Sequence, residues 1–323
     1  MPHPHSLTAP NGAPMSRFAF GTMQFGGRAD AKESAAMFDA CVAAGISHFD
    51  TAYVYTDGAS ETLLGQFAAP LREQLVIATK AAYQGGSGRD NILSGFDISR
   101  QRLGMDFVDI LYLHRFDPTT PLEETFDTLA ELKLRGQIRY IGVSNFAAWQ
   151  VMKAIAVAAE RDLTIDILQP MYNLVKRQAE VELLPMAMDM GLKAAPYSPL
   201  GAGLLTGKYG SATEGGGGGD GRLSEDRRYR ARYSQDWMWQ SAAALAALAA
   251  EVGLDPATLA VAWVAAHPAR PSPILSARNA AQLAPSLAAS SVTLSNDLYE
   301  KLSALSPTPA PATDRLEEIA NRA

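Results

Sequence analysis

The stretch FVDILYLHRFDPTTPLEETFDTLAELKLRGQIRYIGVSN, residues 107–145, decides the fold. It opens with an apolar, β-branched run from Phe107 to His114 and closes with a second such run from Ile138 to Asn145. Between them, apolar residues recur at three- and four-residue spacing from Leu122 to Arg135, and Gly136 follows, as glycine does at many helix ends. The pattern predicts two parallel strands joined by a helix.

The same alternation extends along most of the chain. Six further runs of strand character are Arg17 to Thr22, Ile46 to Asp50, Leu75 to Lys80, Ile165 to Gln169, Leu192 to Tyr197 and Pro273 to Ser276. Helix-like stretches lie among them, including Lys32 to Ala44, Trp149 to Arg161 and Val181 to Met190. Eight strand and helix units predict a (β/α)8 TIM barrel rather than a doubly wound sheet, which usually has fewer strands.

Six of the predicted strands end in one large polar side chain. These residues are Asp50, Lys80, His114, Asn145, Gln169 and Tyr197. In a barrel the carboxyl ends of the strands converge on the face where active sites are built. Polar residues also punctuate strand ends in general, and for any single one of the six that explanation is preferred. For all six together, a shared cavity is the better hypothesis.

Four segments lie outside the repeat. Residues 1–16 are rich in Pro, Ser, Gly and Asn and are predicted to be a disordered leader, so that residues 17–323 form one barrel domain. Residues 207–235 contain a pentaglycine and a basic, aromatic patch, which predicts a long mobile loop after the seventh strand, a candidate lid. Asp236 to Val252 and the tail from Ser295 are predicted to add helices to the barrel.

Composition limits the class of function. The 323 residues contain 28 Lys and Arg against 34 Asp and Glu, a net charge of -6, which argues against a nucleic-acid partner or an anionic membrane surface. The single cysteine, Cys41, excludes an internal disulfide framework and any CxxC site. With neither a signal-peptide pattern nor an apolar window of about 20 residues, we expect a cytoplasmic protein.

Several short motifs resemble known binding signatures but lack residues that those signatures require. The segment from Gly201 to Thr206 begins like GxGxxG but ends in Thr and opens no strand-turn-helix unit. Gly207 and Lys208 resemble the end of a P-loop, but Tyr209 replaces the Ser or Thr that would bind magnesium. HExxH is absent, so we expect no metal site.

A set of longer motifs closely resembles the aldo-keto reductase superfamily. They are GTM at 21–23, FDTAYVYTDGASETLLG at 49–65, ATK at 78–80, LYLHR at 111–115, GVSNF at 142–146, QPMYN at 169–173 and YSPLGAGLLTGKY at 197–209. The match runs over nearly the whole chain. SNFAAWQV at 144–151, MYNLVKRQAEVELLP at 171–185 and YRARY at 229–233 look most like the aflatoxin-aldehyde reductase branch.

The resemblance implies four catalytic residues, and their chemistry is consistent with carbonyl reduction. Tyr55 is the proposed proton donor, although a free phenol with a pKa of about 10 is sluggish at neutral pH. Lys80 would lower the pKa of the phenol, and Asp50 would keep the ammonium charged and oriented. His114 would donate a hydrogen bond to the carbonyl oxygen. The alternative is that these residues are structural, an Asp–Lys ion pair beside a core tyrosine and histidine. That interpretation would be preferred if the four residues were scattered, but each lies inside a family motif, which favours catalysis.

The resemblance also implies a nicotinamide cofactor. Ser144, Asn145 and Gln169 would bind its carboxamide, and Tyr197 would stack on the ring. The remaining predicted contacts are Gly21, Thr22, Met23 and Asp50, then Ser198, Leu200 and Lys208 along the pyrophosphate, and Ser276, Arg278 and Gln282 at the 2′-phosphate and adenine.

The adenosine end departs from the family pattern. Pro285 and Ser286 stand where the family commonly has an acidic residue and Asn, so the adenine amino group loses its usual partners. Arg278 still favours NADPH over NADH, because a guanidinium binds a phosphate bidentately.

Residues that would bind the substrate are Met23, Tyr55 and His114, together with Arg232. In the patch of Tyr229, Arg230, Arg232 and Tyr233, Arg232 is the expected partner of a substrate carboxylate; a solvated charge run is the alternative.

The sequence therefore predicts an NADPH-dependent reductase of aldehydes, and of some ketones, acting on a small-molecule carbonyl substrate without a metal. A nicotinamide-cofactor-binding regulatory or sensor subunit with little turnover is the alternative. The physiological substrate and the oligomeric state stay open.

Overall fold

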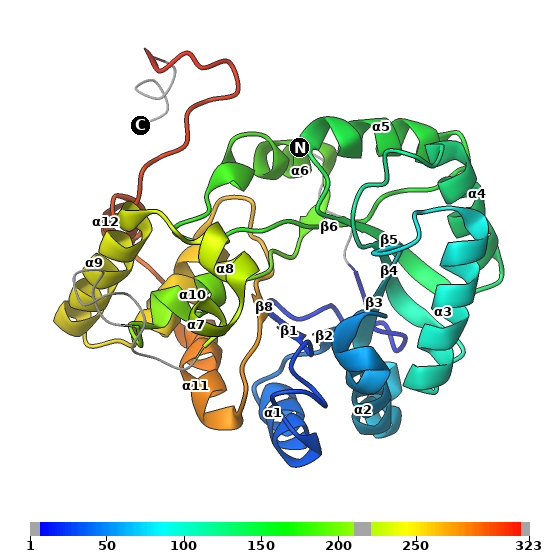
Figure 1. Cartoon of the computed structure of the whole chain (residues 1–323), viewed down its shortest axis with the longest axis horizontal. Coiled ribbons are helices and arrows are strands. Elements are labelled where there is room, and N and C mark those ends of the chain that lie inside the picture. The colour runs from blue at the N-terminus through cyan, green and yellow to red at the C-terminus, as the bar shows by residue number, and fades with distance from the viewer. Residues whose placement is uncertain (1–6, 210–220, 318–323) are drawn as a thin grey trace.

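The eight predicted strands form one parallel sheet that curls into a barrel. The computed structural model describes residues 7–209 and 221–317 (Figure 1). The strand order is β7-β6-β5-β4-β3-β2-β1-β8. Ser272 N donates to Ala194 O at 2.7 Å and Ile274 N donates to Pro196 O at 2.9 Å, so the segments of β8 and β7 also meet. The predicted (β/α)8 architecture is confirmed.

Each strand lies within or next to its predicted run. The strands are β1 (Ala19–Gly21), β2 (His48–Asp50), β3 (Val76–Ala81), β4 (Val108–Leu113), β5 (Ile138–Ser144), β6 (Ile167–Gln169), β7 (Lys193–Ala194) and β8 (Ile274–Leu275). The last two are short because Pro196, Pro271 and Pro273 lack the N–H group that a longer ladder needs.

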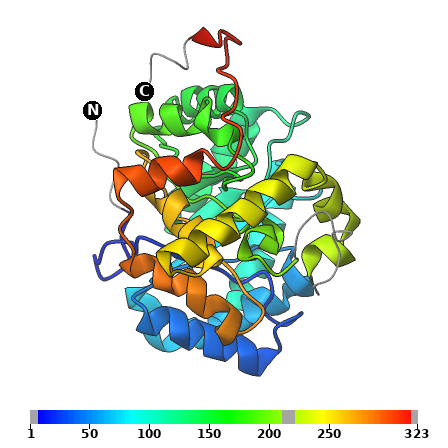
Figure 2. The same cartoon turned by 90° about the vertical axis from the view of Figure 1, so that its left-hand side faces the viewer.

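Helices surround the sheet. They are α1 (Ala31–Ala43), α2 (Ala59–Ala68), α3 (Arg89–Leu103), α4 (Leu122–Leu134), α5 (Ala148–Ala159), α6 (Leu183–Met190), α7 (Arg222–Glu225), α8 (Arg227–Arg232), α9 (Asp236–Val252), α10 (Pro256–Ala266), α11 (Ala280–Ala288) and α12 (Asn296–Ser303). The two additional helices expected from the sequence are α9 and α12. In Figure 2, α9 (yellow) lies on the near side of the molecule with α11 and α12 (orange to red).

Apolar side chains pack on both sides of the sheet. The cluster inside the barrel includes Val76, Ala78, Ile110 and Ile167, and a larger cluster fills the space between the strands and the helices. Because successive side chains of a strand alternate between faces, the residues two positions beyond the interior ones point to the open end of the barrel. This alternation brings the polar strand ends together.

The expected disordered leader is wrong for residues 7–16, and residues 1–6 lie outside the described residues. Met15 N donates to Leu7 O at 2.8 Å, and Leu7 joins the interior cluster, only 1% exposed. Arg139 Nη1 donates to Thr8 O at 2.7 Å, and Ser16 Oγ accepts from Ser47 N at 2.9 Å. This short hairpin closes the amino end of the barrel, because burial and side-chain donors outweigh the flexibility of its Pro and Gly residues.

The segment 207–235 is likewise more ordered than its composition indicates. Residues 210–220, with the pentaglycine, lie outside the described residues. Beyond them, α7 and α8 form two short helices, and Tyr233 packs in the core at 1% exposure. The prediction of a loop is therefore wrong for residues 222–232.

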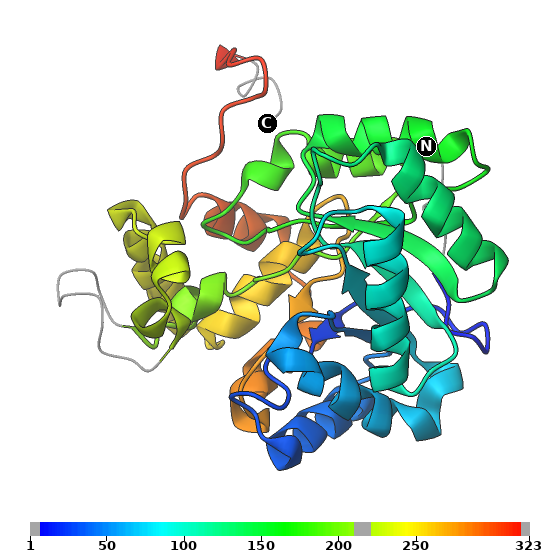
Figure 3. The same ribbon diagram turned by 45° about the vertical axis from the view of Figure 1, so that its right-hand side comes forward.

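The chain leaves the barrel after α12 as an extended segment, drawn in red in Figures 1 and 3. In the described ranges no single helix has the length and apolar character to cross a membrane; α9 and α10, bent by 99°, pass that test only as a pair, by length and composition.

Candidate active site

A cavity of about 960 Å³ opens at the carboxyl ends of the strands. Of the residues predicted to form the site, those that line it are Gly21, Met23, Asp50, Tyr55, His114, Ser144, Asn145, Gln169, Tyr197, Ser198, Leu200, Lys208, Arg232, Ser276, Arg278 and Gln282. Thr22 does not line it: its hydroxyl is fully buried and contacts Ser60 Oγ at 2.8 Å. The Thr22 side chain therefore faces away from the cavity, and its contact with the cofactor stays a prediction.

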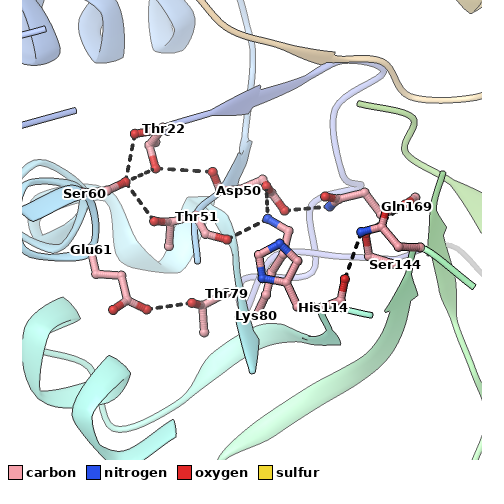
Figure 4. A network of polar contacts seen from close by, with 11 residues as sticks. Thr22, Asp50, Thr51, Ser60, Glu61, Thr79, Lys80, His114, Ser144 and Gln169 are labelled. Carbon is pink, nitrogen blue, oxygen red and sulfur yellow. Dashed lines mark hydrogen bonds and ion pairs between the residues drawn. The ribbon is translucent and has the colours of Figure 1, made fainter. Parts of the chain in front are cut away.

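Lys80 and Asp50 form a buried ion pair (Figure 4), in which Asp50 lines the cavity and Lys80 does not. Lys80 Nζ also donates to Thr51 O at 2.7 Å, and Gln169 Nε2 donates to Asp50 Oδ2 at 2.8 Å. Burial alone would lower the pKa of Lys80, but the charges of Asp50 and Tyr55 outweigh it and raise the pKa above the ordinary lysine value. Lys80 therefore stays an ammonium ion at neutral pH.

Tyr55 lies next to Lys80 and lines the cavity. Lys80 Nζ is 5.1 Å from the centroid of its ring. Burial raises the pKa of Tyr55 above the usual tyrosine value, while the charge of Lys80 lowers it by a smaller amount. The expected effect of Lys80 is present, but in the protein alone burial outweighs it. The phenol is accordingly protonated at neutral pH.

His114 is held between two aromatic rings. Its ring centroid is 4.7 Å from that of Tyr83 and 6.1 Å from that of Tyr55. Burial, and then the charges of Lys80 and Arg115, lower the pKa of His114 to about 3. Its Nδ1 atom is buried without a hydrogen-bond partner among the described residues. His114 is therefore a neutral imidazole with one N–H to donate.

The polar side chains of Ser144, Asn145 and Tyr197, which also line the cavity, form hydrogen bonds with one another. Asn145 Nδ2 donates to His114 O at 2.9 Å and to Ser144 Oγ at 3.1 Å, and Tyr197 Oη donates to Asn145 Oδ1 at 2.7 Å. Ser144 Oγ donates to Gln169 O at 3.0 Å. These contacts fix the orientation of the Asn145 amide, the Ser144 hydroxyl and the Tyr197 ring.

One end of the cavity carries strong positive charge. Lys208, Arg222 and Arg278 line it, and Arg28 lies close enough to influence Lys208 electrostatically. Burial and the charge of Arg278 lower the pKa of Lys208. Glu225 is the acidic residue of this group and forms ion pairs with both Arg28 and Arg278. Four cations with one carboxylate suit a phosphate-bearing ligand.

Two further features fit the phosphate end of a dinucleotide. Ser276 Oγ is buried without a hydrogen-bond partner among the described residues, in a residue that lines the cavity. Gly203 has φ of 94°, and a Cβ there would stand 2.9 Å from Lys208 Cε, so glycine leaves room for the lysine against the backbone. The residues present therefore fit the cofactor that the sequence predicts.

The segment after residue 220 forms one wall of the cavity. Tyr229 and Arg232 line it, with the Arg232 guanidinium carbon 5.2 Å from the centroid of the Tyr229 ring. Arg230 instead donates to Leu223 O at 3.2 Å, and Tyr233 accepts a hydrogen bond from Asn173 Nδ2 at 3.3 Å. The four residues of the patch thus separate into two that face the cavity and two that support the wall.

Other lining residues were not identified from the sequence. They include Tyr83, Gln84, Arg115, Arg228 and Asp255. Arg115 directly follows His114, and Tyr83 and Gln84 lie two and three residues after the end of β3, so a position just after a strand end was an available signal for all three. Arg228 and Asp255 follow no strand end. Among residues 7–209 and 221–317, no group of three or more His, Cys, Asp and Glu side chains is arranged to hold a metal ion.

The fold is a (β/α)8 barrel, and its carboxyl face carries a buried lysine, an aspartate, a tyrosine and a neutral histidine. Enzymes with this fold have their active sites at that face. Residues 17–307 match the model of the Aldo/keto reductase family, and the chain belongs to this family. It is thereby an NAD(P)H-dependent oxidoreductase.

Three relatives show what the chain is similar to. A rice protein named probable voltage-gated potassium channel subunit beta is 35% identical over 91% of this chain and 94% of its own length. Mouse aflatoxin B1 aldehyde reductase member 2 is 39% identical over 65% of this chain and 59% of its own. The uncharacterized oxidoreductase YrpG of Bacillus subtilis is 32% identical over 94% and 95%. The predicted resemblance to the family is confirmed. The match to the rice channel subunit covers more of this chain than the match to the mouse aldehyde reductase, 91% against 65%.

Proposed function

We propose that this protein is an NADPH-dependent reductase that converts aldehydes, and some ketones, to alcohols, with Tyr55 as the proton donor. The observation that carries the proposal is the position of Tyr55. Its phenol lies beside the buried Lys80–Asp50 pair and the neutral His114, at a cavity whose other end is cationic. Such a site offers a proton, a hydrogen-bond donor and a phosphate cradle in one place.

Each residue has a distinct role in the proposal. A nicotinamide cofactor bound in the cavity would supply the hydride for the carbonyl carbon. His114 donates its N–H to the carbonyl oxygen, which stabilises the charge that develops there. Tyr55 donates its proton to that oxygen, and the Lys80 ammonium stabilises the phenolate that remains. Asp50 keeps the ammonium charged and aimed at the phenol.

The cofactor contacts follow the cavity. Ser144, Asn145 and Gln169 bind the carboxamide edge of the nicotinamide, and Tyr197 stacks on its face. Lys208 neutralises the pyrophosphate, and Arg278 selects NADPH through its 2′-phosphate. The position of Arg278 at the cationic end of the cavity supports this role, and the 2′-phosphate would compete with Glu225 for its guanidinium.

The substrate class follows from the wall formed by α8. Arg232 lines the cavity without a carboxylate partner among the described residues, and its guanidinium packs on the Tyr229 ring. The likeness to proteins named aflatoxin aldehyde reductase supports an aldehyde substrate. We propose an aldehyde that bears a carboxylate, with Arg232 as its partner. On the acidic charge balance we also propose no nucleic-acid or membrane partner, and on the sequence pattern a cytoplasmic location.

A regulatory or sensor subunit is the second candidate function. The likeness to proteins named potassium channel subunit beta, which covers 91% of this chain in rice, favours it. A subunit of that kind would bind the cofactor with little turnover.

The rate of NADPH oxidation with a panel of aldehydes, measured in parallel with NADH, separates the two candidates. Steady turnover that Tyr55→Phe abolishes supports the reductase. Tight NADPH binding, measured by quenching of protein fluorescence, with no turnover on any carbonyl compound supports the regulatory subunit.

A further inference from the structure

The turn that carries Tyr55 has an unusual backbone. Tyr55 is followed by three residues with left-handed φ angles: Thr56 at 46°, Asp57 at 53° and Gly58 at 94°. Non-glycine residues in this region persist only where neighbouring groups hold them. Thr56 Oγ1 donates to Phe25 O at 2.8 Å and accepts from Ser60 N at 2.9 Å, which fixes one side of the turn.

Arg102, near the end of α3, holds the other side. Its Nη1 atom donates to Tyr53 O at 2.9 Å, and its guanidinium carbon lies 4.8 Å from the centroid of the Tyr53 ring. A Cβ at Gly58 would stand 2.4 Å from Arg102 Nε, so glycine allows the guanidinium to lie against the turn. Arg102 therefore contacts the chain on both sides of Tyr55.

Glu61 connects this arginine to the strand that carries Lys80. The carboxylate is fully buried, and its Oε2 atom accepts from the same Arg102 Nη1 at 3.2 Å. Its Oε1 atom accepts from Thr79 Oγ1 at 2.7 Å (Figure 4). Thr79 directly precedes Lys80 in β3. A continuous chain of polar contacts thus runs from the turn of Tyr55, through Arg102 and Glu61, to the residue beside Lys80.

We infer that Arg102 and Glu61 are positioning residues, which hold the Tyr55 hydroxyl at a fixed distance from the Lys80 ammonium. The inference rests on the proposed role of Tyr55 as proton donor. Neither Arg102 nor Glu61 lines the cavity, so both act through the backbone of the turn and through β3.

The Coulomb energy explains why the distance matters. The attraction between an ammonium and a phenolate falls as the inverse of their separation. At an effective dielectric constant of about 20, an increase from about 4 to about 6 Å weakens it by about a third, or about tenfold in the ionisation equilibrium of the phenol. Lys80 is the cation that opposes the effect of burial on Tyr55. Loosening the turn therefore slows proton donation.

The test uses variants that avoid an unpaired buried charge. Glu61→Gln with Arg102→Gln removes both charges together and keeps an acceptor for Thr79. Arg102→Lys keeps the cation but not the planar guanidinium. Arg100→Gln is the matched control, because Arg100 lies on the same helix and contacts Asp97 and Asp106 instead of the turn.

We expect the double variant to lose about tenfold or more in kcat, with the Kd for NADPH, from fluorescence quenching, unchanged within about twofold. The solvent deuterium isotope effect on kcat should increase, since proton donation becomes slower relative to the other steps. The kcat of Arg102→Lys should lie between those of the double variant and the wild type. The kcat of Arg100→Gln should equal that of the wild type.

Three results would overturn the inference while the wild type reduces aldehydes and Tyr55→Phe does not. The first is a double variant with wild-type kcat and isotope effect. The second is a loss of kcat with an unchanged isotope effect, and the third is an equal loss in Arg100→Gln; either of these would make the contacts merely structural. If instead Tyr55→Phe stays fully active, the proposed function itself fails, whatever the double variant does.

Discussion

Replacing Lys80 by methionine should destabilise the fold as well as abolish activity. Lys80 and Asp50 are an ion pair whose side chains are 0% and 3% exposed. The substitution leaves the Asp50 carboxylate with the Gln169 amide as its remaining side-chain donor, and it removes the donor to Thr51 O. Breaking one partner of a buried pair costs about 3–5 kcal/mol, which corresponds to a fall of about 10²- to 10⁴-fold in the folded-to-unfolded ratio.

Urea denaturation followed by circular dichroism measures this loss. Asp50→Asn combined with Lys80→Met should recover much of it, because no charge is then left buried. Lys301→Met is the matched control: Lys301 and Asp297 are 61% and 75% exposed, so we expect a change of less than about 1 kcal/mol.

The pH dependence of the same measurement has a definite sign. The pKa of Lys80 is raised in the folded protein, chiefly by Asp50 acting against burial. Its stabilisation is therefore complete below the unfolded lysine value of about 10.4 and is lost as the pH rises through the higher folded value. The difference between wild type and Lys80→Met should shrink at strongly alkaline pH. A loss of less than about 1 kcal/mol at neutral pH would refute the reasoning, because it would mean that water reaches the pair.

Three further predictions concern the chemistry and the ligands. Tyr55→Phe should lower kcat by about 10²- to 10⁴-fold and leave NADPH affinity nearly unchanged, as measured by steady-state kinetics and fluorescence quenching; near-normal turnover would exclude Tyr55 as the acid. Arg278→Ala should weaken NADPH binding more than NADH binding, by about 1.5–3 kcal/mol, and equal losses for the two cofactors would remove Arg278 from the 2′-phosphate role. Arg232→Ala should raise KM for succinic semialdehyde much more than for an uncharged aldehyde of similar length, with kcat little changed. An equal effect on both aldehydes contradicts the carboxylate role, and a raised Kd for NADPH would assign Arg232 to the cofactor instead.

The sequence predicted the barrel because the order of strands and helices is visible in short stretches of sequence. Alternating runs of strand and helix character need only neighbouring residues to be recognised, and all eight strands lie at the predicted places. The polar residues at the strand ends, such as Asp50 and His114, could be assigned to one face because parallel strands in a barrel share a direction. For the same reason the cavity residues near strand ends were predictable, whereas Arg228 and Asp255, which follow no strand, were not.

Composition was a poor guide where distant side chains supply the order. The hairpin of residues 7–16 reads as disordered, yet Leu7 packs inside the barrel and Thr8 is held by Arg139, which is 131 positions away. In the segment after residue 220, Glu225 pairs with Arg28 and Arg278 from two other loops. Neither pattern is visible locally, because each partner is supplied by another part of the chain.

The sequence by itself determined the order of the elements, the class of fold and the residue types at the carboxyl ends of the strands. Only the tertiary structure decided which of these side chains face the cavity and which face the core: Gly21 lines it, and its neighbour Thr22 turns away to Ser60. It also decided that Arg102 and Glu61, far from any strand end, support the turn of Tyr55. The physical reason is that strand and helix periodicity arises from near neighbours, whereas a hydrogen bond between remote residues requires a closed barrel to bring them within about 3 Å.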